Sequence, residues 1–108
     1  MRAFRLTLLG AALLVACGKK DPVAPATNQV SVTDFAFNPT SNTVTAGTTV
    51  TWTFTTTTIH DVTFSTPGMT GSGDKTGGTF AKAFPNAGTF TYQCSHHPVL
   101  MNGTITVQ

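Results

Sequence analysis

The sequence is poor in charge and in cysteine, and it contains no long apolar segment. Charged residues make up only 9% of the 108 residues. If residues 1–16 are removed, four lysines and four aspartates remain, so the rest of the chain is formally neutral. A neutral chain gives no reason to expect a nucleic acid or an acidic partner.

The longest apolar run, from Leu6 to Ala16, is too short to span a bilayer. It follows two arginines and is typical of a secretory signal. It ends in LVAC at 14–17, which resembles the bacterial lipobox, whose cysteine is acylated and becomes the first mature residue. We therefore expect a lipoprotein signal peptide at 1–16, lipidation at Cys17 and a flexible tether over 17–28. The alternative is an ordinary cleaved signal in which Cys17 has no role.

A lipidated Cys17 predicts an extracytoplasmic protein that is anchored to a membrane by lipid and faces the periplasm or the cell surface. Gly18, in place of an aspartate, is typical of lipoproteins released to the outer membrane of a Gram-negative cell. The remaining residues, 29–108, are enough for one modest core and show no internal repeat, so we expect a single domain.

Cysteine is scarce: Cys17 and Cys94 are the only two. Acylation of Cys17 would leave Cys94 without a disulfide partner. A lone thiol outside the cytoplasm is prone to oxidation, so we expect Cys94 to be either deeply buried or bound to a metal as a thiolate.

The domain also lacks any segment with a sustained helical period. Its apolar residues recur at every second position between turn signals, and threonine fills many of the positions between them. This pattern predicts an all-β, Greek-key antiparallel sandwich of about seven to eight strands. The expected strands cover residues 30–37 (with a bulge before Phe35), 44–46, 50–54, 60–64, 79–84, 90–94 and 105–107, and a glycine-rich loop is expected at 66–78.

Strand parity puts His60 and Cys94 in phase with the apolar residues of their own strands, so both side chains are expected to point inward. The loop after Cys94 could return His97 and Met101 to the same point. Two imidazoles, a thiolate and a thioether suit copper, because soft sulfur favours Cu(I) while imidazole accepts Cu(II). Zinc would accept cysteine and histidine, but its structural sites favour paired ligands such as CxxC, and a thioether is a poor zinc ligand.

These residues lie in blocks that resemble the cupredoxin family of small blue (type 1) copper proteins, closest to the plastocyanin and amicyanin group. The blocks are FAFNP at 35–39, AGTTVTW at 46–52, HDVTF at 60–64 and AGTFTYQCSHHPVLMNGTITV at 87–107. The resemblance implies the cupredoxin fold and one type 1 copper ion bound by His60, Cys94, His97 and Met101. The spacing C-x2-H-x3-M is one residue longer than the amicyanin-like loop and one shorter than the plastocyanin-like loop.

Two positions depart from the family pattern. Asp61 stands where the family commonly has asparagine, and His96 stands where it commonly has proline. The resemblance implies that residue 61 joins the two ligand-bearing segments by hydrogen bonding near Ser95, which would keep the site rigid. His96 is expected to point into solvent or, in the alternative, to make a weak second metal contact.

A copper ion held by four protein ligands leaves no position for a substrate, which favours an electron-transfer protein over an enzyme. Gln93 and Ser95 occupy the flanks of the cysteine, where a multicopper oxidase would need histidines. We expect a monomer whose partners are extracytoplasmic redox proteins, such as a c-type cytochrome or a copper or haem oxidoreductase. The resemblance implies docking at an apolar patch near His97, made of Pro98, Val99 and Leu100 with Met69 as a neighbour.

Two other functions compete with electron transfer. A copper carrier or sequestering lipoprotein could use His96, His97, Met69 and Met101 in an open, exchangeable site that would not need Cys94. A threonine-rich structural sandwich would bind no metal, and the order of the four predicted ligands would then be coincidence.

Overall fold

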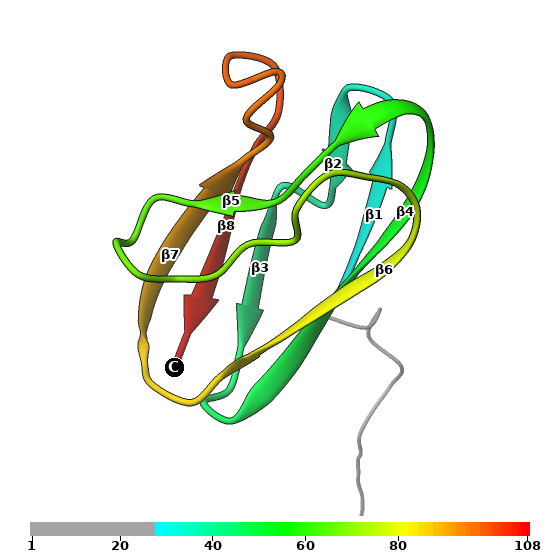
Figure 1. Cartoon of the computed structure of the whole chain (residues 1–108). Coiled ribbons are helices and arrows are strands. Elements are labelled where there is room, and N and C mark those ends of the chain that lie inside the picture. Colours follow the sequence, from blue (N-terminus) through cyan, green and yellow to red (C-terminus); the bar gives the residue numbers. More distant parts are fainter. Residues whose placement is uncertain (1–27) are drawn as a thin grey trace, which may run out of the picture.

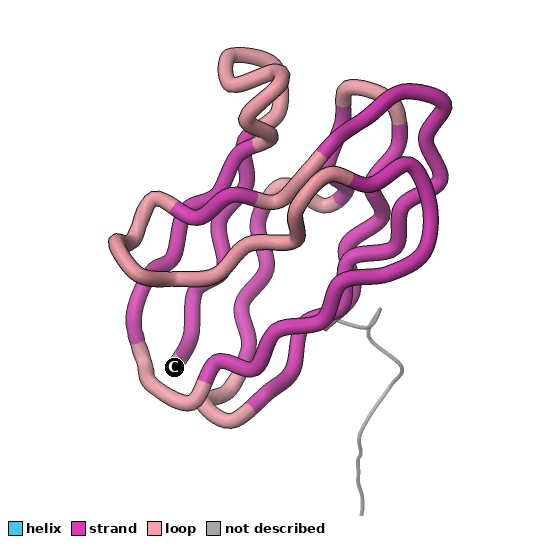
Figure 2. The backbone as a smooth tube through the Cα atoms, viewed as in Figure 1, coloured by secondary structure: helices cyan, strands magenta, loops and turns pink. Residues whose placement is uncertain are grey.

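The computed structural model describes residues 28–108. The expected signal peptide, the predicted lipidation site Cys17 and residues 17–27 of the expected tether lie outside this part of the chain. Within it, strands and loops make up the whole fold (Figure 2). No helix among the described residues is long and apolar enough to cross a membrane.

Eight strands form two four-stranded sheets that pack face to face (Figure 1). One sheet has the order β2-β1-β4-β6 and the other the order β3-β8-β7-β5. The chain passes repeatedly from one sheet to the other, as in a β-sandwich. The strands are β1 (Gln29–Thr33), β2 (Ala36–Asn38), β3 (Ser41–Val44), β4 (Thr48–His60), β5 (Thr63–Phe64), β6 (Lys75–Phe84), β7 (Gly88–Gln93) and β8 (Asn102–Val107).

The core lies between the sheets and follows the predicted alternation. In β4, Val50, Trp52 and Phe54 are buried, whereas the threonines at 49 and 53 are exposed. Trp52 makes edge-to-face contacts with Phe64 and Tyr92 of the opposite sheet. Burial of such large aromatic side chains contributes most of the favourable free energy of a sandwich of this size.

The sandwich is all-β as predicted, but its sheets are mixed rather than antiparallel throughout. β1 pairs in parallel with β4, and β3 pairs in parallel with β8. Alternation of apolar residues reports which face of a strand is buried, and it carries no information on the direction of the neighbouring strand. Parallel neighbours arise here because the chain crosses to the other sheet before it returns.

Two local predictions also change. The expected bulge before Phe35 is a tight turn: Thr33 pairs with Ala36, so Asp34 and Phe35 form a two-residue hairpin loop in which Phe35 has a φ of 65°. The threonine-rich stretch before His60 is not a connection but the last part of β4, with an irregular register between Thr55 and His60. The glycine-rich loop is correspondingly shorter than predicted, because β6 begins at residue 75.

Three segments meet at one end of the sandwich, opposite the carboxyl terminus (Figure 1). They are the end of β4, the turn between β1 and β2, and the loop between β7 and β8. These segments carry every predicted metal ligand.

Candidate metal centre

Three of the predicted ligands meet at this end of the sandwich. His60 ends β4 and Cys94 follows β7, and neither side chain is exposed to solvent. The Sγ atom of Cys94 lies 3.7 Å from Nδ1 of His60 and 3.6 Å from Nδ1 of the half-buried His97. The inward orientation of His60 and Cys94 that strand parity predicts is therefore present.

These separations fit a single metal ion. Bond lengths of about 2.3 Å to sulfur and about 2.0 Å to nitrogen, the values found for zinc, put two ligand atoms about 3.7 Å apart when they subtend about 120° at the metal. The three donor atoms all lie within 4.8 Å of one another. A planar set of two imidazoles and one thiolate suits copper, with a methionine as a weak fourth ligand.

The loop from Cys94 to Met101 is closed by its own backbone. The N–H of His97 donates to the carbonyl of Cys94 at 3.0 Å, and the N–H of Met101 donates to the carbonyl of His97 at 3.0 Å. The N–H of Cys94 donates in turn to the carbonyl of Met101 at 3.1 Å. The loop thus returns Met101 beside Cys94, where the methionine is buried with 1% of its surface exposed.

Asp61 joins the strand side of the centre to this loop, as the family resemblance implies. Its Oδ1 accepts the backbone N–H of Ser95 at 2.7 Å, and its Oδ2 accepts the Ser95 hydroxyl at 2.5 Å. Asp61 is itself buried. Hydrogen bonds to a buried carboxylate are short and strong, so they fix the separation of the two ligand-bearing segments.

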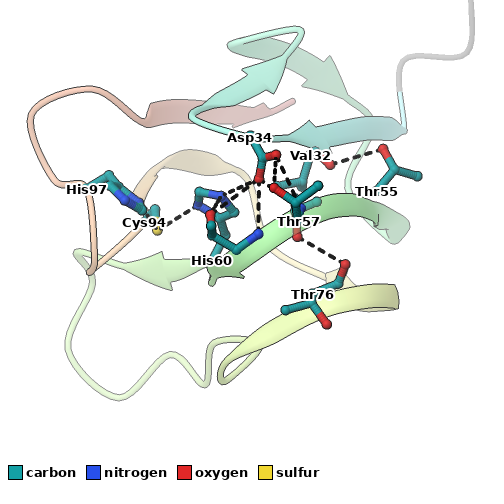
Figure 3. A network of polar contacts seen from close by, with 10 residues as sticks. Val32, Asp34, Thr55, Thr57, His60, Thr76, Cys94 and His97 are labelled. Atoms are coloured by element: carbon teal, nitrogen blue, oxygen red, sulfur yellow. Dashed lines mark hydrogen bonds and ion pairs between the residues drawn. The ribbon is translucent and has the colours of Figure 1, made fainter.

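Asp34 takes part in the centre but was not predicted. Its Oδ1 lies 3.2 Å from Nε2 of His60, on the side of the ring away from Cys94 (Figure 3). The Thr57 hydroxyl donates to Oδ2 at 2.6 Å, and the Thr57 N–H donates to Oδ1 at 3.0 Å. These bonds, the hydroxyl first, hold the pKa of Asp34 well below its usual range. Asp34 and His60 are 26 residues apart, so no local signal could have joined them.

Phe35 is a second residue of the centre that the sequence pattern does not indicate, because an apolar side chain at this position is typical of a strand. Its ring meets the rings of His60 and His97 edge-on, with centroids 5.5 Å and 4.8 Å apart respectively. Half of its surface remains exposed. Phe35 therefore covers the two histidines on their solvent side.

His96 turns away from the donor atoms, as expected for a residue next to a predicted ligand. Its Nε2 lies 2.8 Å from Oδ1 of Asp74, and both side chains are exposed. The hydrogen bond to Asp74 raises the pKa of His96. His96 is thus a surface histidine with Asp74 as its partner. The alternative of a second metal contact stays a prediction, since ligand atoms of His96, Asp74 and Asp61 lie within 4.8 Å of one another.

The predicted docking residues separate into two places. Val99 and Leu100 are strongly exposed, at 88% and 69%, and Pro98 beside them is also exposed. Met69 is half-buried and packs near Phe84 and Phe90, and Phe90 lies near the start of β7, away from Cys94 beyond its end. Met69 thus packs against the core from the glycine-rich loop, and its part in a docking surface stays a prediction.

The fold and this donor set define a β-sandwich protein with a copper site. Comparison with known proteins agrees: the profile of the copper-binding proteins of the plastocyanin/azurin family matches residues 24–108. The chain belongs to this family, and its domain holds one copper ion.

Solved structures show the same likeness. A purple cupredoxin from Nitrosopumilus maritimus is 26% identical with a TM-score of 0.67, over 74% of this chain and 98% of its own. Amicyanin from Paracoccus versutus is 26% identical with a TM-score of 0.68, over 80% of this chain and 85% of its own. An oxidised amicyanin mutant is 25% identical with a TM-score of 0.68, over 80% of this chain and 86% of its own. No curated protein sequence matches the chain.

Proposed function

We propose that the chain is an electron-transfer protein whose copper ion is bound by Nδ1 of His60, Sγ of Cys94, Nδ1 of His97 and the Met101 thioether. The observation that carries this proposal is the buried Cys94 sulfur, which has an imidazole nitrogen 3.6 Å away on one side and 3.7 Å away on the other. The likeness to an oxidised amicyanin mutant adds support.

The ligand geometry suits repeated gain and loss of one electron. Copper supplies the Cu(II)/Cu(I) couple, and the protein supplies donors that are already in position. The end of β4 carries His60, the backbone-closed loop carries the other three ligands, and Asp61 joins the two segments through Ser95. Donors that move little between the two oxidation states lower the reorganisation that electron transfer requires. We propose no catalytic reaction, because four protein donors leave no position for a substrate.

The surface beside His97 suits a redox partner. Pro98, Val99 and Leu100 are exposed on the loop, and Phe35 is half-exposed next to the His97 ring. We propose that these four residues, named here the apolar patch, form the docking surface of a monomer for a c-type cytochrome or for a copper or haem oxidoreductase. Small apolar contacts suit partners that must separate after each transfer.

The protein would act outside the cytoplasm, anchored by lipid on Cys17 at the end of the tether. This part of the proposal rests on the sequence from Arg2 to Cys17, which lies outside the described residues. The outer membrane is the expected location in a Gram-negative cell.

The visible absorption spectrum of the protein with Cu(II) tests the function directly. An intense blue thiolate-to-copper band is expected, and Cys94→Ser should abolish it. Cys17→Ser, which removes the other cysteine, should leave the band unchanged. If the wild-type protein and Cys94→Ser bound copper equally without the band, electron transfer would be rejected in favour of a copper carrier. If neither bound copper, the sandwich would be structural.

A further inference from the structure

Asp34 and His60 form a carboxylate–histidine pair behind the metal centre. Oδ1 of Asp34 lies 3.2 Å from Nε2 of His60, the ring nitrogen on the side opposite Cys94 (Figure 3). His60 is fully buried, whereas the side chain of Asp34 keeps 30% of its surface exposed. In metal sites such a partner for the outer ring nitrogen orients the histidine and makes it a stronger donor.

The chemistry of the contacts decides which nitrogen carries the proton. A carboxylate at neutral pH offers only acceptor oxygens, so Nε2 must donate if the contact with Asp34 is to be favourable. The hydroxyl of Thr58 lies 3.1 Å from Nε2 and 3.3 Å from Oδ1 of Asp34, so it can accept from the ring while it donates to the carboxylate. With its proton on Nε2, neutral His60 directs the lone pair of Nδ1 toward Cys94.

The carboxylate is held in this position from the other side by β4. Both Thr57 and Thr58 donate to it through their backbone N–H groups, at 3.0 Å and 3.3 Å, and Thr57 also donates through its hydroxyl at 2.6 Å. The two-residue turn between β1 and β2 leaves Asp34 little backbone freedom. The irregular register of β4 between Thr55 and His60 lies at these donors. The threonine-rich stretch thus has a specific role in the centre.

We propose that Asp34 is a positioning residue for the copper centre. Its carboxylate fixes His60 with the proton on Nε2, presents Nδ1 to the metal, and by its charge favours Cu(II) over Cu(I). This inference rests on the proposed function, in which His60 is a copper ligand.

The test compares reduction potentials of the full-length protein and its variants at one pH and one salt concentration. Asp34→Ala removes both the acceptor and the charge, and it should lower the preference for Cu(II) over Cu(I) about tenfold, which is a rise in potential of about 59 mV. Asp34→Asn keeps an acceptor oxygen and should show a smaller rise. If the alanine variant does not fold, the potential of Asp34→Asn alone tests the inference.

Asp74→Asn is the matched charge control, because it removes an equal charge next to His96 without touching His60. The reduction potential of Asp74→Asn should rise by less than half as much as that of Asp34→Ala. If Asp34→Ala kept the blue band and its potential rose no more than that of Asp74→Asn, the inference would be overturned while the proposed function stood.

A second measurement needs no copper. In the copper-free protein, the ¹⁵N NMR shifts of the His60 ring should show the proton on Nε2, and Asp34→Ala should show a mixture of the two neutral forms. A proton on Nδ1 in the wild-type protein would overturn the inference. If the wild-type protein lacked the blue band, the proposed function would fail, and the NMR result alone would decide the role of Asp34.

Discussion

His60 lies at the end of a strand whereas His97 lies in a loop, and the two are held in different ways. His60 is fully buried, and its outer nitrogen is bonded to Asp34 and Thr58. His97 is half-buried, and its loop is closed by bonds between the loop's own backbone groups. Val99 and Leu100, in the same loop, are exposed to solvent.

The difference indicates a division of roles within one small centre. The strand side, with hydrogen bonds from distant parts of the chain, fixes the position and the donor strength of a ligand. The loop side carries the exposed apolar surface that a partner can reach. If the two sides have these roles, substitutions on the strand side should change the potential, and substitutions at the tip of the loop should change rates.

The base of the loop should be the most sensitive point of the centre. Gly103 pairs with Tyr92 across β7 and β8, just beyond Met101. A Cβ atom at Gly103 would overlap the ring and hydroxyl of Tyr92, whose ring is buried and packs against Phe37 and Trp52. Gly103→Ala should therefore lower the free energy of unfolding by about 3 kcal/mol, more than a hundredfold in the equilibrium. Denaturant unfolding of the copper-free protein measures this change.

Gly77→Ala is the control for that measurement. Gly77 lies in β6, and a Cβ atom there would meet no neighbour. Its effect should stay within about 0.5 kcal/mol. Equal effects of the two variants would show that Tyr92 does not fix the base of the loop.

Asp61 joins the two sides, so its replacement should cause the next largest loss of stability. Asp61→Ala removes two bonds to Ser95 and leaves a backbone N–H without its acceptor. The expected loss of stability is about 2 kcal/mol. Ser95→Ala, which removes only the hydroxyl bond, should cost about half as much in the same unfolding measurement. If both variants unfolded like the wild type, the two sides would be held together by packing alone.

The sequence was sufficient for the buried positions because alternation is a local property. Val50, Trp52 and Phe54 face the core, as does Tyr92, and His60 and Cys94 do so for the same reason. Each lies an even number of residues from the nearest buried apolar residues along the chain. The family resemblance then supplied the order of the ligands and the bridge from Asp61 to Ser95.

The supporting contacts of the strand side could not be predicted in this way. Asp34 reaches His60 only because β1 and β4 are parallel neighbours, and alternation does not specify neighbours. The positive φ of Phe35 could not be predicted either, since an aromatic residue is typical of a strand and rare in the left-handed conformation. The packing of Met69 on the core could not be predicted either, because the course of a glycine-rich loop depends on what it packs against.

At the tip of the loop, Leu100→Lys should change rates without changing the fold. Leu100 is 69% exposed, so its replacement leaves the core intact. In electron self-exchange two copies of the protein would meet through the apolar patch, and two lysines would then repel each other. The self-exchange rate measured by NMR line broadening should fall about tenfold at low salt and recover as salt is added.

Thr89→Lys provides the same charge at an exposed position near the start of β7, away from the loop. It should leave self-exchange nearly unchanged. Equal slowing by both lysine variants would mean that net charge, and not the apolar patch, controls the encounter.

Phe35 contacts both histidines. Its replacement should have the smallest effect of the four, but the direction of that effect tests the division of roles most sharply. Alanine at position 35 keeps the left-handed backbone, so Phe35→Ala removes the ring and leaves the turn strain as it was. Loss of the ring would let water approach His60 and His97 and so favour the more highly charged Cu(II). The potential should fall by about 28 mV, a threefold change in preference, opposite in sign to the rise expected for Asp34→Ala.

Ile59→Ala is the matched control for Phe35, because Ile59 is 48% exposed against 50% for Phe35 and it directly precedes His60 on the outer face of β4. It should leave the potential unchanged. A rise in Phe35→Ala, or equal shifts in the two variants, would contradict a specific covering role. Opposite shifts in potential from Asp34→Ala and Phe35→Ala would instead mean that one two-residue turn adjusts the potential in both directions. Asp34 would lower it through the hydrogen bond to His60, and Phe35 would raise it by excluding water from the histidines.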